Sequence, residues 1–124
     1  MHFRRYQGGF RKLTTWKEAH ELTLMIYKIT VLFPKEERFA MVSQLRRAAY
    51  SIESQIAEGS CMQTSPHQKS FYDRAYGSCV EVDNFLELAH DLNYLKSEQY
   101  QQLLKKVNKL AFLIQRLSES CVNV

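Results

Sequence analysis

Three side chains that could support covalent chemistry lie close together in the middle of the 124-residue chain. The stretch SIESQIAEGSCMQTSPHQKSF (residues 51–71) contains Ser60, Cys61 and His67. Nucleophilic catalysis needs such a hydroxyl or thiol with a base in reach. The segment lacks both the strand-to-helix elbow of a catalytic serine and the Gly-x-x-x-x-Gly-Lys-Ser/Thr pattern of a phosphate-binding loop. It therefore favours a corner between two helices, and we expect no catalytic residue and no enzyme activity.

Metal chemistry is also disfavoured. The chain has a single Glu-x-x-His pair, Glu87 and His90, whereas a di-iron bundle needs two such pairs and two further glutamates pointing inward. The apolar stripe of this segment places both residues on the solvent side. Cys61, Cys79 and Cys121 form no Cys-x-x-Cys pair, which argues against a zinc site or a disulfide framework. We expect no metal and no other cofactor.

The elements that position these residues are helices. Apolar residues recur at the 3.6-residue spacing of an amphipathic helix in four segments. We predict these helices at about 15–33, 36–58, 66–92 and 98–118. Only four Gly and two Pro are present, which favours long helices. Because the connections are short, neighbouring helices should be antiparallel. The predicted fold is all-α: an up-down-up-down four-helix bundle over residues 14–120, after a basic N-terminal arm at residues 1–13.

Residues with strong positional preferences mark the predicted helix ends. Thr15 opens a Thr-x-x-Glu capping box, and Ser65 followed by Pro66 suits the start of the third helix. Ser97 is the predicted cap of the fourth helix. Gly59 is the expected left-handed stop of the second.

Basic residues gather in two places. The net charge of +4 permits an acidic partner such as RNA or DNA. In the arm, bases alternate with aromatic residues, which suits phosphate contact and base stacking. In the fourth helix the bases share one outer face. The candidate nucleic-acid-binding residues are Arg4, Arg5, Arg11, Lys12, Lys105, Lys106, Lys109 and Arg116. The alternatives are a frayed terminus and a solvated charged face.

Two helices carry a second apolar stripe. The residues outside the main stripe are Leu24, Tyr27 and Val31 in the first helix and Tyr72, Tyr76 and Val80 in the third. A helix that is apolar on two faces is buried on two sides, so we expect contact with another subunit. A wider contact within the chain, or scattered exposed apolar residues, is the alternative.

Three ordered motifs resemble one protein family. They are KLTTWKEAHELTLMIYKIT, FPKEERFAMVSQLRRAAYSIESQIAEG and FYDRAYGSCVEVDNFLELAHDLNYL, within residues 12–117. They resemble the bacterial four-helix-bundle proteins encoded by intervening sequences in 23S ribosomal RNA genes, the S23 family. The resemblance implies an up-down bundle and a closed homo-oligomeric ring, with five subunits as the expected number. The family is similar to the accessory variability determinant proteins of diversity-generating retroelements, basic pentameric barrels that bind nucleic acid and a reverse transcriptase.

The matched blocks QLRRAAYSI, IAEG and YGSCVE supply the structural or interface candidates. These are Arg46, Arg47, Gln55, Glu58, Gly59, Gly77, Ser78 and Glu81. Small residues such as Gly77 should let the second and third helices approach closely. Arg46 or Arg47 could neutralise Glu58 or Glu81 at a seam between helices or subunits. The family usually has Asn before IAEG, and if that Asn makes a specific buried hydrogen bond, the longer Gln55 must reach a different partner.

The expected function is therefore a non-enzymatic homo-oligomeric bundle that binds RNA or DNA through basic surfaces. The alternative is a protein-interaction scaffold or an accessory subunit for a nucleic-acid enzyme such as a reverse transcriptase. The sequence has no apolar run long enough for a signal peptide or a membrane span, and its scattered cysteines fit a reducing compartment. We expect a cytoplasmic protein without membrane contact.

Overall fold

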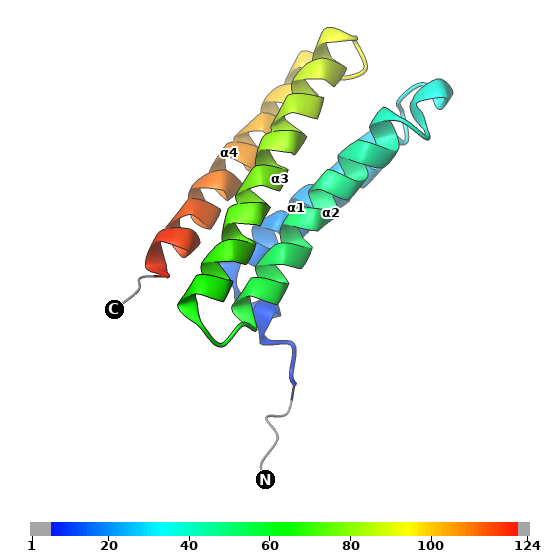
Figure 1. The fold of residues 1–124 in the computed structure, drawn as a ribbon. Coiled ribbons are helices and arrows are strands. Elements are labelled where there is room, and N and C mark those ends of the chain that lie inside the picture. The colour runs from blue at the N-terminus through cyan, green and yellow to red at the C-terminus, as the bar shows by residue number, and fades with distance from the viewer. Residues whose placement is uncertain (1–5, 122–124) are drawn as a thin grey trace.

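Four long helices form an antiparallel bundle in the computed structural model, which describes residues 6–121 (Figure 1). The α-helices are α1 (Thr14–Thr30), α2 (Met41–Ser60), α3 (Ser65–Asp91) and α4 (Ser97–Ser120), with 3-10 turns η1 (Gly9–Lys12) and η2 (Lys35–Glu37). Consecutive helices run in opposite directions, and α4 packs back against α1. The described residues contain no strand, so the all-α prediction is confirmed. No helix among them is long and apolar enough to cross a membrane.

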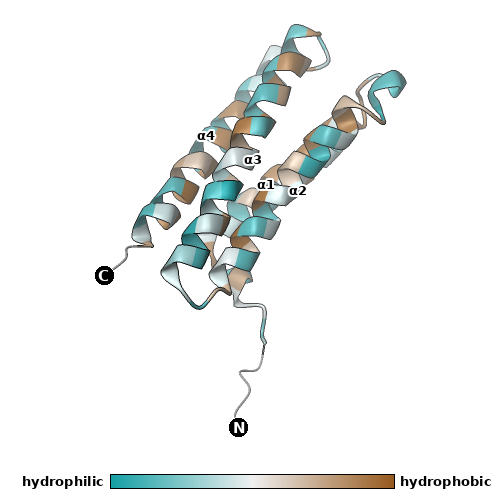
Figure 2. Cartoon of the chain, in the orientation of Figure 1, coloured by the Kyte–Doolittle hydropathy of each residue, from teal (hydrophilic) through white to brown (hydrophobic). Residues whose placement is uncertain are grey.

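The predicted apolar stripes meet along the bundle axis, and polar residues dominate the outer faces (Figure 2). The largest fully buried side chains are Leu22, Ile26, Leu45, Ile52, Ile56, Cys79, Val82, Leu86, Val107, Leu110 and Ile114. Burying one such Leu or Ile contributes about 1.5–3 kcal/mol, so this axial layer is the main source of stability. Burial also raises the pKa of the Cys79 thiol to about 12.

The start of α1 differs from the prediction. The helix begins at Thr14, with Leu13 in an extended conformation at the N-cap. Thr15 is buried inside the first turn, with 6% of its surface exposed, and its side chain makes no capping hydrogen bond. Glu18 turns towards α4 rather than back to the helix start. The predicted capping box is therefore wrong, because tertiary ion pairing takes its glutamate.

The end of α1 and the start of α2 are also further apart than predicted. The helix α1 ends at Thr30 rather than 33, and the next residues form a turn. Residues 36–40 do not belong to α2, because Ala40 leaves the helical region at φ −119°, ψ −102°. Glu37 instead accepts a hydrogen bond of 2.9 Å from the Tyr94 hydroxyl, which raises the Tyr94 pKa and ties two loops together.

Gly59 has a packing role rather than a stop role. The helix α2 continues through it to Ser60, and among the described glycines only Gly8 has a positive φ. A Cβ added at Gly59 would lie 2.8 Å from Tyr72 Cε1 and 3.0 Å from Phe71 Cβ. The absent side chain lets α3 approach, so the predicted left-handed stop is wrong.

The helices α3 and α4 each begin one residue earlier than predicted. Thr64 and Lys96 hold the N-cap positions in extended conformations, which places Ser65 and Ser97 inside the helices. Pro66 still lies in the first turn of α3, where its missing N–H costs nothing. The helices also end at Asp91 and Ser120, not at 92 and 118.

The chain turns at Asn93, just beyond the C-terminal end of α3. Asn93 adopts a left-handed conformation with φ 65°. Its N–H donates to His90 O at 3.0 Å, and the N–H of Tyr94 donates to Ala89 O at 2.8 Å. These bonds satisfy the last carbonyls of the helix, as a left-handed C-terminal cap does.

Candidate functional site

The potential nucleophiles of the α2–α3 corner have local partners. Ser60 Oγ donates to Ala57 O at 2.7 Å, and Cys61 Sγ lies 3.9 Å from Ser60 Oγ. His67 Nδ1 lies 2.8 Å from Thr64 Oγ1 at the start of α3. No hydrogen bond among residues 6–121 joins His67 to Ser60 or Cys61. The corner therefore does not place the His67 imidazole beside Ser60 or Cys61.

The Glu-x-x-His pair lies on the outside of α3. The His90 ring stacks on the Tyr100 ring, with 4.4 Å between centroids, and its Nε2 lies 3.5 Å from Ser97 Oγ. Glu87 is exposed. Within the described part of the chain, no group of three or more His, Cys, Asp or Glu side chains could hold a metal ion.

Two of the four candidate bases on α4 pair with acids on α1. Glu18 Oε2 lies 2.6 Å from Lys106 Nζ, and Glu18 Oε1 lies 3.1 Å from Lys109 Nζ. Lys106 also pairs with Glu21. Only 14% of the Glu18 side chain and 18% of the Lys106 side chain are exposed. These four residues, the α1–α4 charge cluster, bring acids to bases that the sequence assigned to nucleic acid.

Hydrogen bonding sets the pKa shifts in the α1–α4 charge cluster. The close contact with Lys106 is the main reason that the pKa of Glu18 is lowered, and Lys109 adds to it against the effect of burial. For Lys106, desolvation lowers the pKa, but the bonds to Glu18 and Glu21 together outweigh it and raise the value. Both groups therefore stay ionised at neutral pH. The carboxylates of Glu18 and Glu21 compensate the positive charge of Lys106, which disfavours binding of an external phosphate there.

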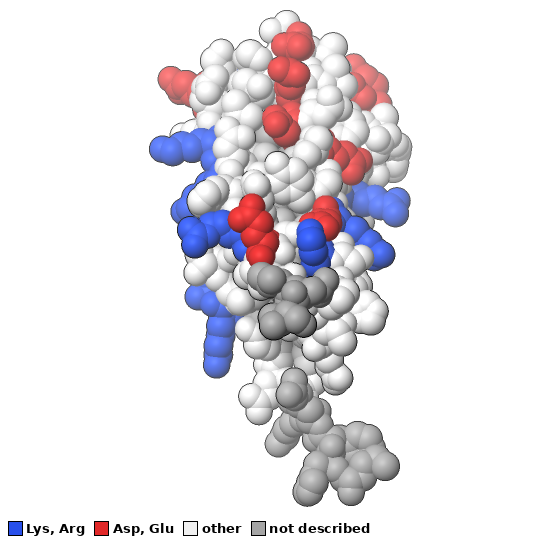
Figure 3. Space-filling view, turned by 60° about the vertical axis from the view of Figure 1, so that its left-hand side comes forward, with Lys and Arg blue, Asp and Glu red and all other residues white. Residues whose placement is uncertain are grey.

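The other two candidate bases of α4 remain on the surface. Lys105 is exposed, and the Arg116 guanidinium lies 5.7 Å from the centre of the exposed Phe112 ring. In the face drawn in Figure 3, Asp and Glu are spread over the upper part and the middle, while Lys and Arg lie mostly along the sides lower down, with acidic and basic groups side by side near the centre. This mixed pattern does not favour a nucleic acid laid along that face.

The described part of the arm joins bases to aromatic rings. The Arg11 guanidinium lies 4.6 Å from the centre of the Phe10 ring. Phe10 packs edge-on against Trp16 at 5.1 Å, and Trp16 stacks on His20 at 4.8 Å. Lys12 is exposed beside them. Candidate residues Arg4 and Arg5 lie outside the described residues.

Lys17 extends this basic end, and the sequence reasoning missed it. It is exposed in the first turn of α1, next to η1. Neither it nor Arg11 or Lys12 forms an ion pair with an Asp or Glu that the structure describes. No sequence signal indicates it, because Glu21 lies one helical turn away as an apparent partner, whereas in the structure Glu21 pairs with Lys106.

The second apolar stripe of α1 is on the surface. The exposed fractions are 57% for Leu24, 40% for Tyr27 and 72% for Val31. Arg46 covers part of this surface: its guanidinium lies 4.6 Å from the centre of the Tyr27 ring. Arg46 also donates to Thr30 Oγ1 at 2.9 Å and to Tyr27 O at 3.2 Å. It therefore binds α1, and its proposed pairing with Glu58 or Glu81 within the chain is wrong.

The second stripe of α3 is split between core and surface. Tyr76 and Val80 are 41% and 57% exposed, as the pattern predicts. Tyr72 is not part of this surface, because only 4% of it is exposed and its ring packs against Gly59. Burial raises the pKa of its hydroxyl.

Three polar side chains connect α2 and α3. Gln55 Nε2 donates to Ser51 Oγ at 2.7 Å, and Ser51 Oγ lies 3.2 Å from Ser78 Oγ. Gln55 Oε1 is buried and has no partner among the described residues. Gly77 is exposed, and an added Cβ would meet nothing within 4 Å, so the predicted close approach of α2 and α3 does not depend on it.

A hollow of about 530 Å³ opens beside these residues, between α2 and α3. It is lined by Gln44, Arg47, Ala48, Ser51 and Glu81. Arg47 and Glu81 are both exposed, yet no ion pair joins them, and Glu58 is exposed further along α2. The positive and negative walls of this hollow thus remain available to another molecule.

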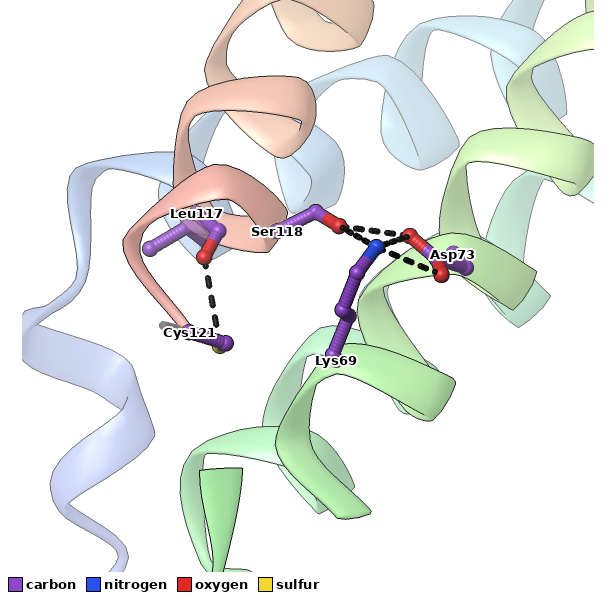
Figure 4. A network of polar contacts seen from close by, with 5 residues as sticks. All are labelled: Lys69, Asp73, Leu117, Ser118 and Cys121. Carbon is purple, nitrogen blue, oxygen red and sulfur yellow. Dashed lines mark hydrogen bonds and ion pairs between the residues drawn. The ribbon is translucent and has the colours of Figure 1, made fainter. Parts of the chain in front are cut away.

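A polar network at the end of the bundle where α3 begins and α4 ends was not predicted (Figure 4). Ser118 Oγ donates to Asp73 Oδ1 at 2.5 Å, and Lys69 Nζ contacts both, at 3.0 Å to Ser118 Oγ and 3.0 Å to Asp73 Oδ2. The hydrogen bond from Ser118 is the main cause of the lowered Asp73 pKa, with help from Lys69. A serine in the inward position of the α4 stripe, one turn after Ile114, is the signal that could have indicated it.

Comparison with known proteins gives a matching family and similar solved structures. The sequence model of the family described as 23S rRNA-intervening sequence protein matches residues 11–116. Among solved structures, the chain is similar to a protein of unknown function from the S23 ribosomal protein family of Bacteroides thetaiotaomicron VPI-5482. The TM-score is 0.78 at 21% identity, over 85% of this chain and 95% of that one. No curated protein matches the chain.

Proposed function

We propose that this chain, which belongs to the 23S rRNA-intervening sequence protein family, is a self-associating, non-enzymatic helical bundle that binds RNA or DNA. The binding surface is the basic end formed by η1 and the start of α1, rather than the whole of α4. Lys105 and Arg116 are left as secondary contacts, since Lys106 and Lys109 are occupied by Glu18 and Glu21.

One observation carries the nucleic-acid part of the proposal. Arg11, Lys12 and Lys17 project from one end of the bundle without an acidic partner among the described residues, beside the exposed ring of Tyr6. Lys and Arg side chains without an acidic partner bind phosphates, which releases counterions from the nucleic acid. Neighbouring aromatic rings can in addition stack on the nucleobases. Such a combination is typical of proteins that bind single-stranded nucleic acid.

Self-association is supported by the surfaces that the single chain leaves uncovered. Leu24, Tyr27 and Val31 on α1 and Tyr76 and Val80 on α3 are at least 40% exposed. The two groups lie on helices that do not contact each other among the described residues, and exposed apolar groups of this kind are typical of protein interfaces. The open hollow between Arg47 and Glu81 offers both charges to a second copy. Repeating the basic end around an oligomer would let weak sites act together.

The test is a fluorescence-anisotropy titration with RNA and DNA strands at two salt concentrations. For single strands, each lost phosphate contact should reduce the slope of log K against log salt by about 0.7. We expect Arg11→Ala/Lys12→Ala to weaken binding and to lower this slope. The matched control is Lys35→Ala/Lys96→Ala, which removes two exposed bases at the opposite end of the bundle.

Two results would argue against the proposal. If both double variants lost the same amount of nucleic-acid affinity, the binding surface would not lie at the η1 end. Absent or salt-insensitive binding would reject nucleic-acid binding altogether and favour the protein-interaction scaffold. In that case a protein partner captured in a pull-down should still be captured after nuclease treatment.

A further inference from the structure

A hollow at the basic end of the bundle is not explained by phosphate contacts. It lies where η1 passes the C-terminal end of α2 and has a volume of about 520 Å³. Its walls include Tyr6, Gly8, Phe10, Leu13, Cys61 and Met62. Two of these side chains are aromatic and none of the lining residues is acidic. This is the chemistry of a site for a flat, apolar group attached to a negative charge.

Gly8 gives the hollow its shape. It is buried, with φ 64°, a left-handed conformation that favours glycine. Its carbonyl accepts a hydrogen bond of 3.3 Å from Arg11 Nη1, and a Cβ at this position would collide with the same guanidinium. The turn therefore holds the Arg11 charge close to the rim while Tyr6 and Phe10 form the walls.

The aromatic walls of the hollow suit a nucleobase, and Arg11 at its rim suits the phosphate of the same nucleotide. The Tyr6 ring is 71% exposed, so one of its faces is free for stacking. The Arg11 guanidinium lies over Phe10 and remains accessible. A paired base inside a duplex cannot enter a hollow of this kind, because its faces are covered by its neighbours.

We propose that this hollow between η1 and the end of α2 takes an unpaired nucleobase of a single-stranded nucleic acid, with Tyr6 as the stacking platform and Arg11 on the adjoining phosphate. The inference rests on the proposed nucleic-acid binding and narrows it: single strands should bind in preference to duplexes of the same sequence. RNA and DNA share the base chemistry, so both are tested.

Cys61 provides a reporter inside the site. It is the exposed cysteine, whereas Cys79 is buried with a pKa of about 12 and serves as an unreactive internal control. In the full-length Cys121→Ser variant, alkylation of Cys61 is followed by mass spectrometry. A single strand of about 12 nucleotides, within the range that such modules cover, is compared with its duplex and with an abasic strand of equal length.

We expect the single strand to slow Cys61 alkylation by about tenfold, and the duplex and the abasic strand to change it by less than about twofold. Equal protection by the abasic strand would overturn the proposal, because phosphates alone would then cover the thiol. Salt-dependent binding without Cys61 protection would also overturn it, while leaving the proposed function intact. No binding of any strand would reject both.

Variants test the stacking separately from folding. Tyr6→Ala should weaken single-strand binding by about tenfold and leave duplex binding unchanged, since stacking is lost but the charges remain. Tyr50→Ala, which removes an exposed tyrosine from α2, is the matched control and should bind normally. Gly8→Ala should strain the turn and displace the Arg11 guanidinium, which its Cβ would meet, so the protection of Cys61 should be lost. Normal single-strand affinity in Tyr6→Ala would contradict the proposal.

Discussion

Glu18 on α1 and Lys106 on α4 lie 2.6 Å apart, with most of each side chain buried. This pair links the first helix to the last and also removes from the surface a base that the sequence alone would offer to a nucleic acid. Its removal should therefore affect stability. Glu18→Gln leaves Lys106 with Glu21 only, and we expect a loss of about 1–3 kcal/mol in the free energy of unfolding at neutral pH. Urea denaturation measures it. Glu36→Gln, an exposed change in η2, is the control and should stay within about 0.5 kcal/mol of wild type.

The same pair predicts a pH dependence. The pKa of Glu18 is lower in the folded state than its ordinary value of 4.5. The stabilisation is therefore fully present above pH 4.5 and is lost as the pH falls through the folded pKa. The stability difference between wild type and Glu18→Gln should be constant near neutral pH and should shrink in acid. A difference that persists undiminished to the acid limit would show that packing, rather than ionisation, is responsible.

Two helix-interior glycines should respond oppositely to alanine. Gly59→Ala should destabilise the bundle by about 1–3 kcal/mol, because the new Cβ meets the Tyr72 ring at 2.8 Å. Gly77→Ala should stabilise it by up to about 1 kcal/mol, because the same methyl meets nothing within 4 Å and alanine favours a helix. Thermal unfolding of both variants gives the comparison. Destabilisation of equal size at both sites would contradict the packing role of Gly59.

Ser118→Ala should change the titration of Asp73. Ser118 donates a hydrogen bond to the Asp73 carboxylate and is the main cause of its lowered pKa. Without it, the pKa of Asp73 should rise towards its ordinary value of 3.8, while the pKa of Glu18 stays unchanged. Carboxyl-detected NMR titration measures both. An unaltered Asp73 titration would mean that Lys69, rather than Ser118, lowers the pKa of Asp73.

Charge reversal tests whether Arg47 and Glu81 meet across copies of the chain. Arg47→Glu or Glu81→Arg alone should reduce the oligomeric mass in sedimentation, because each juxtaposes like charges at the interface. The double reversal should restore the mass, since every contact then regains opposite charges. The melting temperature of the diluted single chain serves as a control for folding. If the double reversal restored the melting temperature of the single chain but not the oligomeric mass, Arg47 and Glu81 would interact within one chain instead.

The sequence alone determined the helices and the buried core. Periodicity fixes which residues share a helix face, so each predicted helix has a buried apolar stripe, as Val42, Leu45, Ala49, Ile52 and Ile56 form on α2. Short loops leave few alternatives to antiparallel neighbours, and the bundle follows from these two facts. The exposure of Leu24 and Val31 was also readable, because their spacing places them off the core stripe.

Only the tertiary structure decided which polar groups have partners and which glycine is required. Glu18 could equally have closed a capping box at Thr15 or paired with a distant lysine, and the choice depends on how α4 lies against α1. Gly59 and Gly77 look alike in sequence, but only one faces the neighbouring helix. Local spacing sets the face of a residue, whereas its partner depends on the rotation and depth of another helix, which no local pattern encodes.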